Sequence, residues 1–109
     1  MSEQELKNRT KAFALRVMKL VGALPDGSVA RTIGNQLLRS GTSVGANYRA
    51  ACRGRSKAEF IAKLGIVVEE ADETCYWPEL IIEGHLFVAN LVEPLLQEAN
   101  ELTAIMVAS

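Results

Sequence analysis

The sequence has few of the residues that interrupt or cross-link a chain. Its 109 residues include three prolines, two cysteines and one histidine. Few prolines suit long helices, and two cysteines do not make a disulfide framework. No apolar run reaches the roughly 18 residues that mark a membrane span, and the charged N-terminus lacks an apolar signal region. We therefore expect one all-α domain over residues 1–109, in the cytoplasm and without membrane contact.

Lysine and arginine are absent after Lys63. The segment from Lys7 to Lys63 holds all twelve Lys and Arg, and with four acids up to that point the net charge is +8. Residues 64–109 hold nine acids, for a net charge of −9. Such asymmetry indicates an anionic partner or charge-matched assembly. Alternatively, basic helices simply lie beside acidic ones in an antiparallel bundle.

The scarcity of histidine also argues against catalysis. A carboxylate-bridged metal pair needs Glu-x-x-His, whereas the residue three before His85 is Ile82. Arg49 and Arg53 could lower the pKa of Cys52, but Cys–His chemistry would then depend on His85 alone. A phosphate-binding G-x-x-x-x-G-K-S/T loop is missing. We expect no metal, no cofactor and no enzymatic activity.

Periodic apolar residues predict four helices, over approximately residues 3–23, 28–53, 57–83 and 90–107. Short turns between helices of matched length favour an antiparallel up-down four-helix bundle. The apolar faces on which this prediction rests are Leu6, Phe13, Val17, Leu20 and Leu24; Val29, Ile33, Leu37, Val44, Tyr48 and Ala51; Phe60, Leu64, Val67, Ala71, Thr74 or Cys75, Pro78 and Ile82; and Leu91, Leu95, Ala99, Leu102 and Met106.

Local signals predict how these helices begin and end. Ser56 and Glu59 form an S-x-x-E capping box for the third helix. Asp26 or Ser28 is expected to cap the second helix, and Asn90 the fourth.

Three further residues mark turns or bends. Gly54 is expected to adopt left-handed angles after the second helix. Pro78 should bend the third helix after Thr74, and Gly84 with His85 should end it.

Arginines gather on one arc of the second helix, opposite its apolar face. On a helical wheel Arg31, Arg39, Arg49 and Arg53 share this arc. Together with the turn that follows, the nucleic-acid-binding candidates are Arg31, Arg39, Arg49, Arg53, Arg55 and Lys57. They could neutralise phosphates, or they could pair with Glu69, Glu70 or Glu73 of the third helix or of a neighbouring subunit.

Small and polar residues occupy the middle of the second helix. Gly41 and Gly45 lower helix stability by about 1 kcal/mol each relative to Ala. They therefore indicate close packing, first by a helix of the same bundle and otherwise by another subunit or nucleic acid. Asn47 is expected to bond across to the third helix or to a backbone carbonyl, in a structural polar network with Gln36 and Ser43.

Residues 36–60, QLLRSGTSVGANYRAACRGRSKAEF, resemble the signature of the four-helix-bundle family named after proteins encoded in intervening sequences of bacterial 23S ribosomal RNA genes. The matching positions are Gln36, Arg39, Ser40, Ser43, Asn47, Arg53, Arg55, Ser56, Glu59 and Phe60, and residues 98–105, EANELTAI, extend the likeness. Many members have an acidic residue and Gly after the Asn, where this chain has Tyr48, Arg49 and two alanines.

The resemblance implies short up-down bundles that assemble as ring-shaped homopentamers. Similar proteins include the accessory factor of diversity-generating retroelements, which binds nucleic acid and a reverse transcriptase. For most members the biochemical activity is unassigned.

Apolar residues outside the third helix's seam independently favour an oligomer: Ile66, Val68, Trp77, Ile81, Leu86 and Phe87. We expect a non-enzymatic, oligomeric interaction module that binds RNA or DNA electrostatically through the basic face of the second helix, beside a protein partner in some settings. The alternative is a scaffolding homo-oligomer that binds a protein partner and uses its arginines in intersubunit salt bridges.

Overall fold

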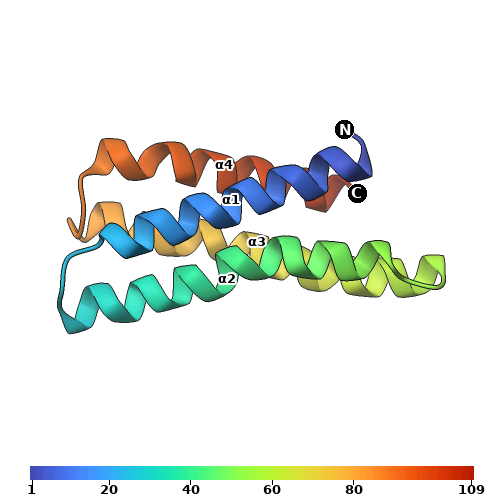
Figure 1. Cartoon of the computed structure of the whole chain (residues 1–109), viewed down its shortest axis with the longest axis horizontal. Coiled ribbons are helices and arrows are strands. Elements are labelled where there is room, and N and C mark those ends of the chain that lie inside the picture. The colour runs from blue at the N-terminus through green and yellow to red at the C-terminus, as the bar shows by residue number, and fades with distance from the viewer.

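The computed structural model describes all residues 1–109 and contains four α-helices and no strand. The helices are α1 Glu3–Ala23, α2 Ser28–Cys52, α3 Lys57–Glu83 and α4 Ala89–Ala108. They run alternately up and down in a rod of 45 × 23 × 19 Å, with both termini at the same end (Figure 1). The predicted antiparallel four-helix bundle is confirmed. None of the helices carries an apolar stretch long enough to cross a bilayer.

Contacts between the helices are uneven. The longest contact joins α2 and α3, while α1 packs on α2 and α4 packs on α3. In contrast, α1 and α4 meet over a short stretch near the termini and lie further apart toward the opposite end (Figure 1). The bundle is therefore closed along three edges and partly open along the fourth.

One arginine holds the short α1–α4 edge together. Arg9 donates from Nε and Nη2 to the two carboxylate oxygens of Glu98, each at 2.7 Å, and from Nη2 to Glu101 at 3.1 Å. Hydrogen bonding to Glu98 raises the pKa of Arg9 above its already high value. A bidentate pair of this kind fixes orientation as well as distance. The contact joins residues far apart in the chain, and the periodicity of the sequence does not predict it.

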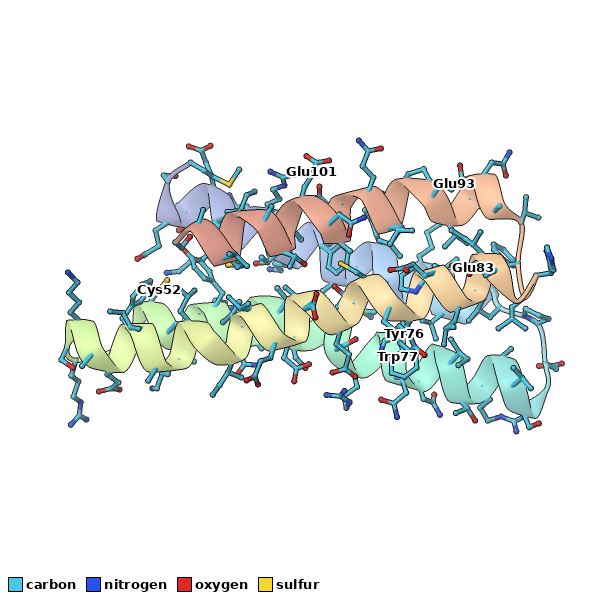
Figure 2. All side chains as sticks on the ribbon, turned by 180° about the vertical axis from the view of Figure 1, so that it is seen from behind. Cys52, Tyr76, Trp77, Glu83, Glu93 and Glu101 are labelled. Atoms are coloured by element: carbon cyan, nitrogen blue, oxygen red, sulfur yellow. The ribbon has the colours of Figure 1, made fainter.

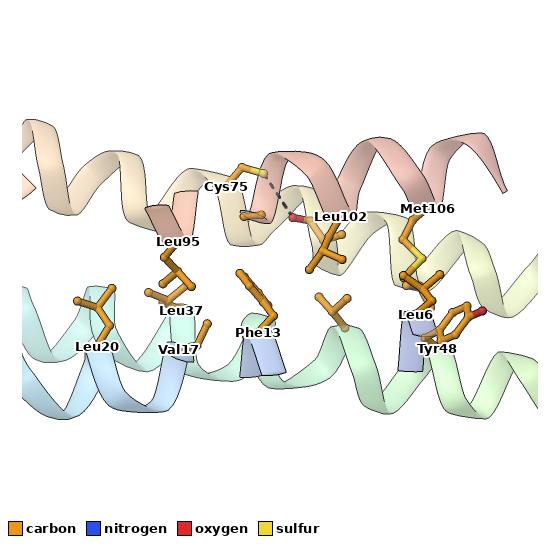
Figure 3. Packing of buried hydrophobic residues seen from close by; sticks show 14 of the residues in the cluster. Leu6, Phe13, Val17, Leu20, Leu37, Tyr48, Cys75, Leu95, Leu102 and Met106 are labelled. Atoms are coloured by element: carbon orange, nitrogen blue, oxygen red, sulfur yellow. Dashed lines mark hydrogen bonds between the residues drawn. The ribbon is translucent and has the colours of Figure 1, made fainter. Parts of the chain in front are cut away.

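The core runs along the whole bundle axis. It contains 17 buried apolar residues, among which Phe13, Leu37 and Leu102 are almost fully covered (Figure 3). Each buried side-chain nitrogen and oxygen has a hydrogen-bond partner. Thr10, for example, donates to the carbonyl of Leu6 within α1. The polar residues of the core are thus satisfied inside their own helices.

Two predicted core positions are wrong. Val29 is 62% exposed, because α1 meets this part of α2 through Ala30 and Gly34 instead. Leu91 is 60% exposed, because it lies where α1 and α4 separate and Val92 takes the inward position.

A different error concerns the apolar residues placed outside the α3 seam. Ile81 is fully buried, and Ile82, which was assigned to the seam, is half-buried. Val68, Trp77, Leu86 and Phe87 are half-buried, so only Ile66 of that group is largely exposed. The single bundle hides more of this apolar surface than the sequence predicts.

Two helix caps also differ from expectation. The residue before α2 is Gly27 with φ of 133°, and neither Asp26 nor Ser28 makes a capping bond. Only glycine adopts this angle readily, so the sharp reversal moves Asp26 out of range. Helix α4 begins after Val88 rather than Asn90. The chain turns within a few residues, with His85 at φ of 55°, and resumes the helix early.

The start and end of α3 agree better with the sequence. Ser56 Oγ accepts from the backbone N–H of Glu59 at 3.1 Å, as the capping box predicts. Gly84 ends the helix. The expected bend at Pro78 stays a prediction, and α3 continues through it to Glu83.

Gly54 follows α2 without the left-handed angles that the sequence suggested. An added Cβ would lie 3.0 Å from the Ala51 carbonyl and 3.1 Å from the Phe60 nitrogen. The tight turn into α3 therefore excludes a larger side chain here for reasons of space rather than backbone angle.

Glycines in α2 allow α1 to pack very closely against it. This confirms the first predicted explanation for these glycines, which was close packing by a helix of the same bundle. A Cβ on Gly41 would lie 2.8 and 2.9 Å from the two methyl carbons of Val17, and one on Gly45 would lie 3.1 Å from Thr10 Oγ1. Real Cβ atoms essentially never approach as closely as at Gly41, and the contact at Gly45 would be unusually tight. The missing side chains therefore set the distance between α1 and α2.

Substituting Gly41 with alanine tests this packing. Gly41→Ala should lower the free energy of unfolding by about 1–3 kcal/mol, because buried, β-branched Val17 cannot move aside without strain. The matched control Gly65→Ala lies in the interior of α3 with nothing within 4 Å. It should raise stability by up to about 1 kcal/mol through helix propensity alone. Urea unfolding at matched concentrations measures both, and equal effects would contradict the packing account.

Candidate nucleic-acid interface

Five of the six cations predicted to bind nucleic acid are exposed and make no ion pair within the chain. They are Arg31, Arg49, Arg53, Arg55 and Lys57. The sixth, Arg39, pairs with Glu73 and with Glu70 at 3.4 Å on α3. Hydrogen bonding to Glu73 raises the pKa of Arg39. For this one arginine, the structure agrees with the alternative prediction of a salt bridge to the third helix.

The remaining candidates do not form one continuous site. Arg31 and Arg53 are separated by about 33 Å along α2. Arg31 lies beside the α1–α2 turn, whereas Arg55 and Lys57 lie at the α2–α3 turn. The structure brings Arg49 and Arg53 together, on one side of the C-terminal half of α2.

Arg49 and Arg53 face two lysines of α1 across a groove of about 410 Å³. Lys7 and Lys11 form the opposite rim, because the antiparallel arrangement puts the start of α1 beside the end of α2. The other lining residues carry no charge: Gln4, Asn8, Thr10, Ala14, Thr42, Gly45 and Ala46. Four cations thus surround a groove without a lining carboxylate. We call it the α1–α2 groove.

Close helix packing forms the floor of the α1–α2 groove. Gly45 contacts Thr10 between the two helices, and the small side chains of Ala14 and Ala46 leave the space above open. One acid approaches the rim, since Lys7 Nζ lies 3.2 Å from Glu3. Glu3 is 61% exposed, so this pair is weak in water. The groove therefore keeps a strongly positive character.

Sequence reasoning missed Lys7 and Lys11. They lie four residues apart on one face of α1, beside the small residue Ala14. This spacing is visible in the sequence and could have marked the two lysines as a second basic row. Its relation to Arg49 and Arg53 depends on which helices are neighbours and in what register, and the helical wheel of one helix does not contain this information.

The predicted polar network of Gln36, Ser43 and Asn47 does not form. Asn47 Nδ2 donates to the backbone carbonyl of Ser43 at 2.9 Å, which is one of the two bonds expected for it. Ser43 Oγ donates to the carbonyl of Arg39, and no hydrogen bond joins the Gln36 side chain to either residue. Ser43 and Asn47 thus bond to carbonyls one turn back in α2, as short polar side chains within a helix often do.

The arginines beside Cys52 in the sequence do not lower the pKa of its thiol. The thiol is half-buried at the end of α2, and burial raises its pKa instead of nearby arginines lowering it. Burial likewise raises the pKa of neighbouring Tyr48 to about 12. Cys75 is buried as expected, within reach of Thr103 Oγ1 at 3.5 Å, and burial raises its pKa too.

A further recess lies between α1 and α4 where these helices separate. It has a volume of about 350 Å³ and a mainly apolar lining of Leu20, Ala23, Phe87, Leu91 and Leu95, with Arg16 and Lys19 on its rim. On the other side of the bundle, acids follow α3 and α4, including Glu83, Glu93 and Glu101 (Figure 2). No three His, Cys, Asp or Glu side chains converge as a metal site would require.

The raised thiol pKa values predict slow alkylation. At pH 8 Cys52 should react with a maleimide more slowly than free cysteine, because less of it is thiolate. Cys75 should react more slowly still, and both should react quickly in urea. Intact-mass spectrometry over time measures these rates. A native Cys52 that reacts as fast as free cysteine would contradict the environment described.

Comparison with known proteins agrees with the fold. A family model described as 23S rRNA-intervening sequence protein matches residues 2–108. A search of curated proteins finds no match. Among solved structures, the chain is similar to a protein of unknown function from the S23 ribosomal protein family of Bacteroides thetaiotaomicron. The two share 35% identity with a TM-score of 0.87, over 94% of this chain and 95% of that one. The chain belongs to the family of 23S rRNA-intervening sequence proteins.

Proposed function

We propose that this protein is a non-enzymatic interaction module that binds RNA or DNA through phosphate contacts. The observation that carries the proposal is the convergence of Lys7, Lys11, Arg49 and Arg53 around a groove without a lining carboxylate. Like charges brought together repel one another, and an anionic ligand relieves that repulsion. Arg55 and Lys57, at the adjacent turn, extend the positive surface.

We also propose that the protein acts as a homo-oligomer, with a pentamer as the expectation from the family resemblance. Two observations support assembly. The apolar recess between α1 and α4 exposes Leu91, and of the nine acids of residues 64–109 only Glu70, Glu73, Glu98 and Glu101 form an ion pair within the chain. We propose the cytoplasm as its setting, since both cysteines are free.

The second candidate function is a scaffold that binds a protein partner and no nucleic acid. The Arg39 contact with Glu70 and Glu73 favours it, because in this contact an arginine of the arc pairs with carboxylates of the protein itself. In the scaffold, Arg49 and Arg53 would meet acids of a neighbouring subunit in the same way. The two candidates differ in whether these arginines stay open to solvent in the assembled particle.

Fluorescence anisotropy with labelled RNA and DNA tests the proposal at about 50 and 200 mM salt. Wild type should bind at the lower salt and weaken steeply at the higher. Arg49→Gln/Arg53→Gln should bind more weakly and with a smaller salt dependence, because two phosphate contacts are removed. Arg39→Gln is the matched control, and it should bind like wild type since Arg39 is already paired.

Light scattering on each variant separates binding from assembly. An unchanged particle mass with reduced binding supports the nucleic-acid module. Absence of wild-type binding at about 50 mM salt, or dissociation of the particle in Arg49→Gln/Arg53→Gln, would reject it and favour the scaffold.

A further inference from the structure

We propose that the α1–α2 groove holds the sugar-phosphate backbone of a single nucleic-acid strand, that Lys7 and Lys11 contribute as much as Arg49 and Arg53, and that the bases point to solvent. This inference rests on the proposed function and makes it specific. It assigns half of the binding contacts to Lys7 and Lys11 of α1. These two lysines are not part of the basic arc of α2.

The spacing of the four cations suits a chain of regularly placed charges. Lys7 and Lys11 are one helical turn apart on α1, and Arg53, the residue directly after α2, follows Arg49 of the last turn by four residues. Residues so spaced have Cβ atoms about 5–6 Å apart and side chains that point the same way. The two pairs therefore form parallel rows of positive charge on opposite rims. A strand lying along the groove can place successive phosphates between the rows.

The lining favours backbone contacts over base contacts. No aromatic residue lines the groove, so bases have nothing to stack on. Tyr48 is directed into the core. Polar contacts are available from Asn8, whose Oδ1 accepts from Gln4 Nε2 at 3.0 Å. This bond leaves the Asn8 amide N–H groups free to donate to a phosphate oxygen.

The dimensions favour a single strand over a duplex. The groove lies between two helices in direct contact and has a volume of about 410 Å³. Packed helix axes are about 8–10 Å apart, so the rims are close together. A duplex is stiff over about 150 base pairs and presents its phosphates on a convex rod. A flexible single strand can enter the groove, whereas a duplex touches only its rims.

Removing the α1 cations tests the inference directly. Lys7→Gln/Lys11→Gln deletes two charges from the rim that sequence reasoning missed. The matched control is Arg16→Gln/Lys19→Gln, which deletes two exposed charges from the same helix outside the groove. Short single strands of about six nucleotides, within the range of one binding module, keep each ligand to one groove.

The expected effect is a change in salt dependence. For a single strand, each phosphate contact adds about 0.7 to the steepness with which the logarithm of affinity falls against the logarithm of salt concentration. Four contacts therefore predict that wild-type affinity falls about 50-fold between about 50 and 200 mM salt. With two contacts left, Lys7→Gln/Lys11→Gln should fall only about 7-fold, and it should bind more weakly at the lower salt. The Arg16→Gln/Lys19→Gln control should keep the wild-type dependence.

A second variant keeps all four cations. Ala46 is exposed on the groove wall, so Ala46→Glu adds a carboxylate there without disturbing the core. It should abolish binding of the short strand at about 50 mM salt. Circular dichroism and light scattering should match those of wild type. A duplex of the same sequence should bind at least about tenfold more weakly than the single strand, because it reaches fewer of the cations.

The results separate this inference from the proposed function. If wild type binds and Lys7→Gln/Lys11→Gln behaves like Arg16→Gln/Lys19→Gln, the α1–α2 groove is not the binding site, while the proposal of nucleic-acid binding stands. Equal affinity for duplex and single strand would also overturn the groove. If wild type binds no nucleic acid at about 50 mM salt, both proposals fall together.

Discussion

The contact between α1 and the glycines of α2 is the constraint on which the rest of the structure depends. Gly41 and Gly45 have no side chains to keep α1 away, and Val17 and Thr10 fill the space. Because the two helices touch at this level, the side chains on either side of the contact are brought close together. The same glycines that weaken α2 as an isolated helix therefore position both the apolar core and the basic rims above it.

Charge is divided between the two halves of the bundle. Helices α1 and α2 carry eight of the twelve cations, and α3 and α4 carry most of the acids. Within one chain the halves are joined by two arginines, Arg9 to α4 and Arg39 to α3. These contacts fix the positions of the helices. Because both arginines are already paired, we do not count them among the nucleic-acid-binding residues. Four of the remaining cations, Lys7, Lys11, Arg49 and Arg53, surround the α1–α2 groove, so a net charge near zero is compatible with binding a polyanion.

Much of the fold could be predicted from the sequence because its signals are local. Pro25 and Gly27 separate the first two helices, Ser56 and Glu59 begin the third, and the predicted bounds agree with the structure within a residue or so. The errors concern positions where a distant helix decides. Leu91 has apolar periodicity but lies where α1 has moved away, so it is exposed.

The candidate site was predictable only in part for the same reason. The arc of α2 arginines is visible in the sequence, yet Arg39 lies opposite two acids on α3 and Arg49 lies opposite lysines on α1. A helical wheel treats these two arginines alike, and their different surroundings follow from tertiary packing. Cys52 illustrates the same limit, because burial against its neighbours outweighs the arginines beside it in sequence.

A backbone-amide NMR titration with a short single strand tests the central claim most directly, because it locates the ligand without any substitution. The account predicts salt-sensitive shift changes that concentrate between Gln4 and Ala14 on α1 and between Thr42 and Arg53 on α2. Changes confined to α3 and α4, or centred on Arg31 at the far end of α2, would contradict the account.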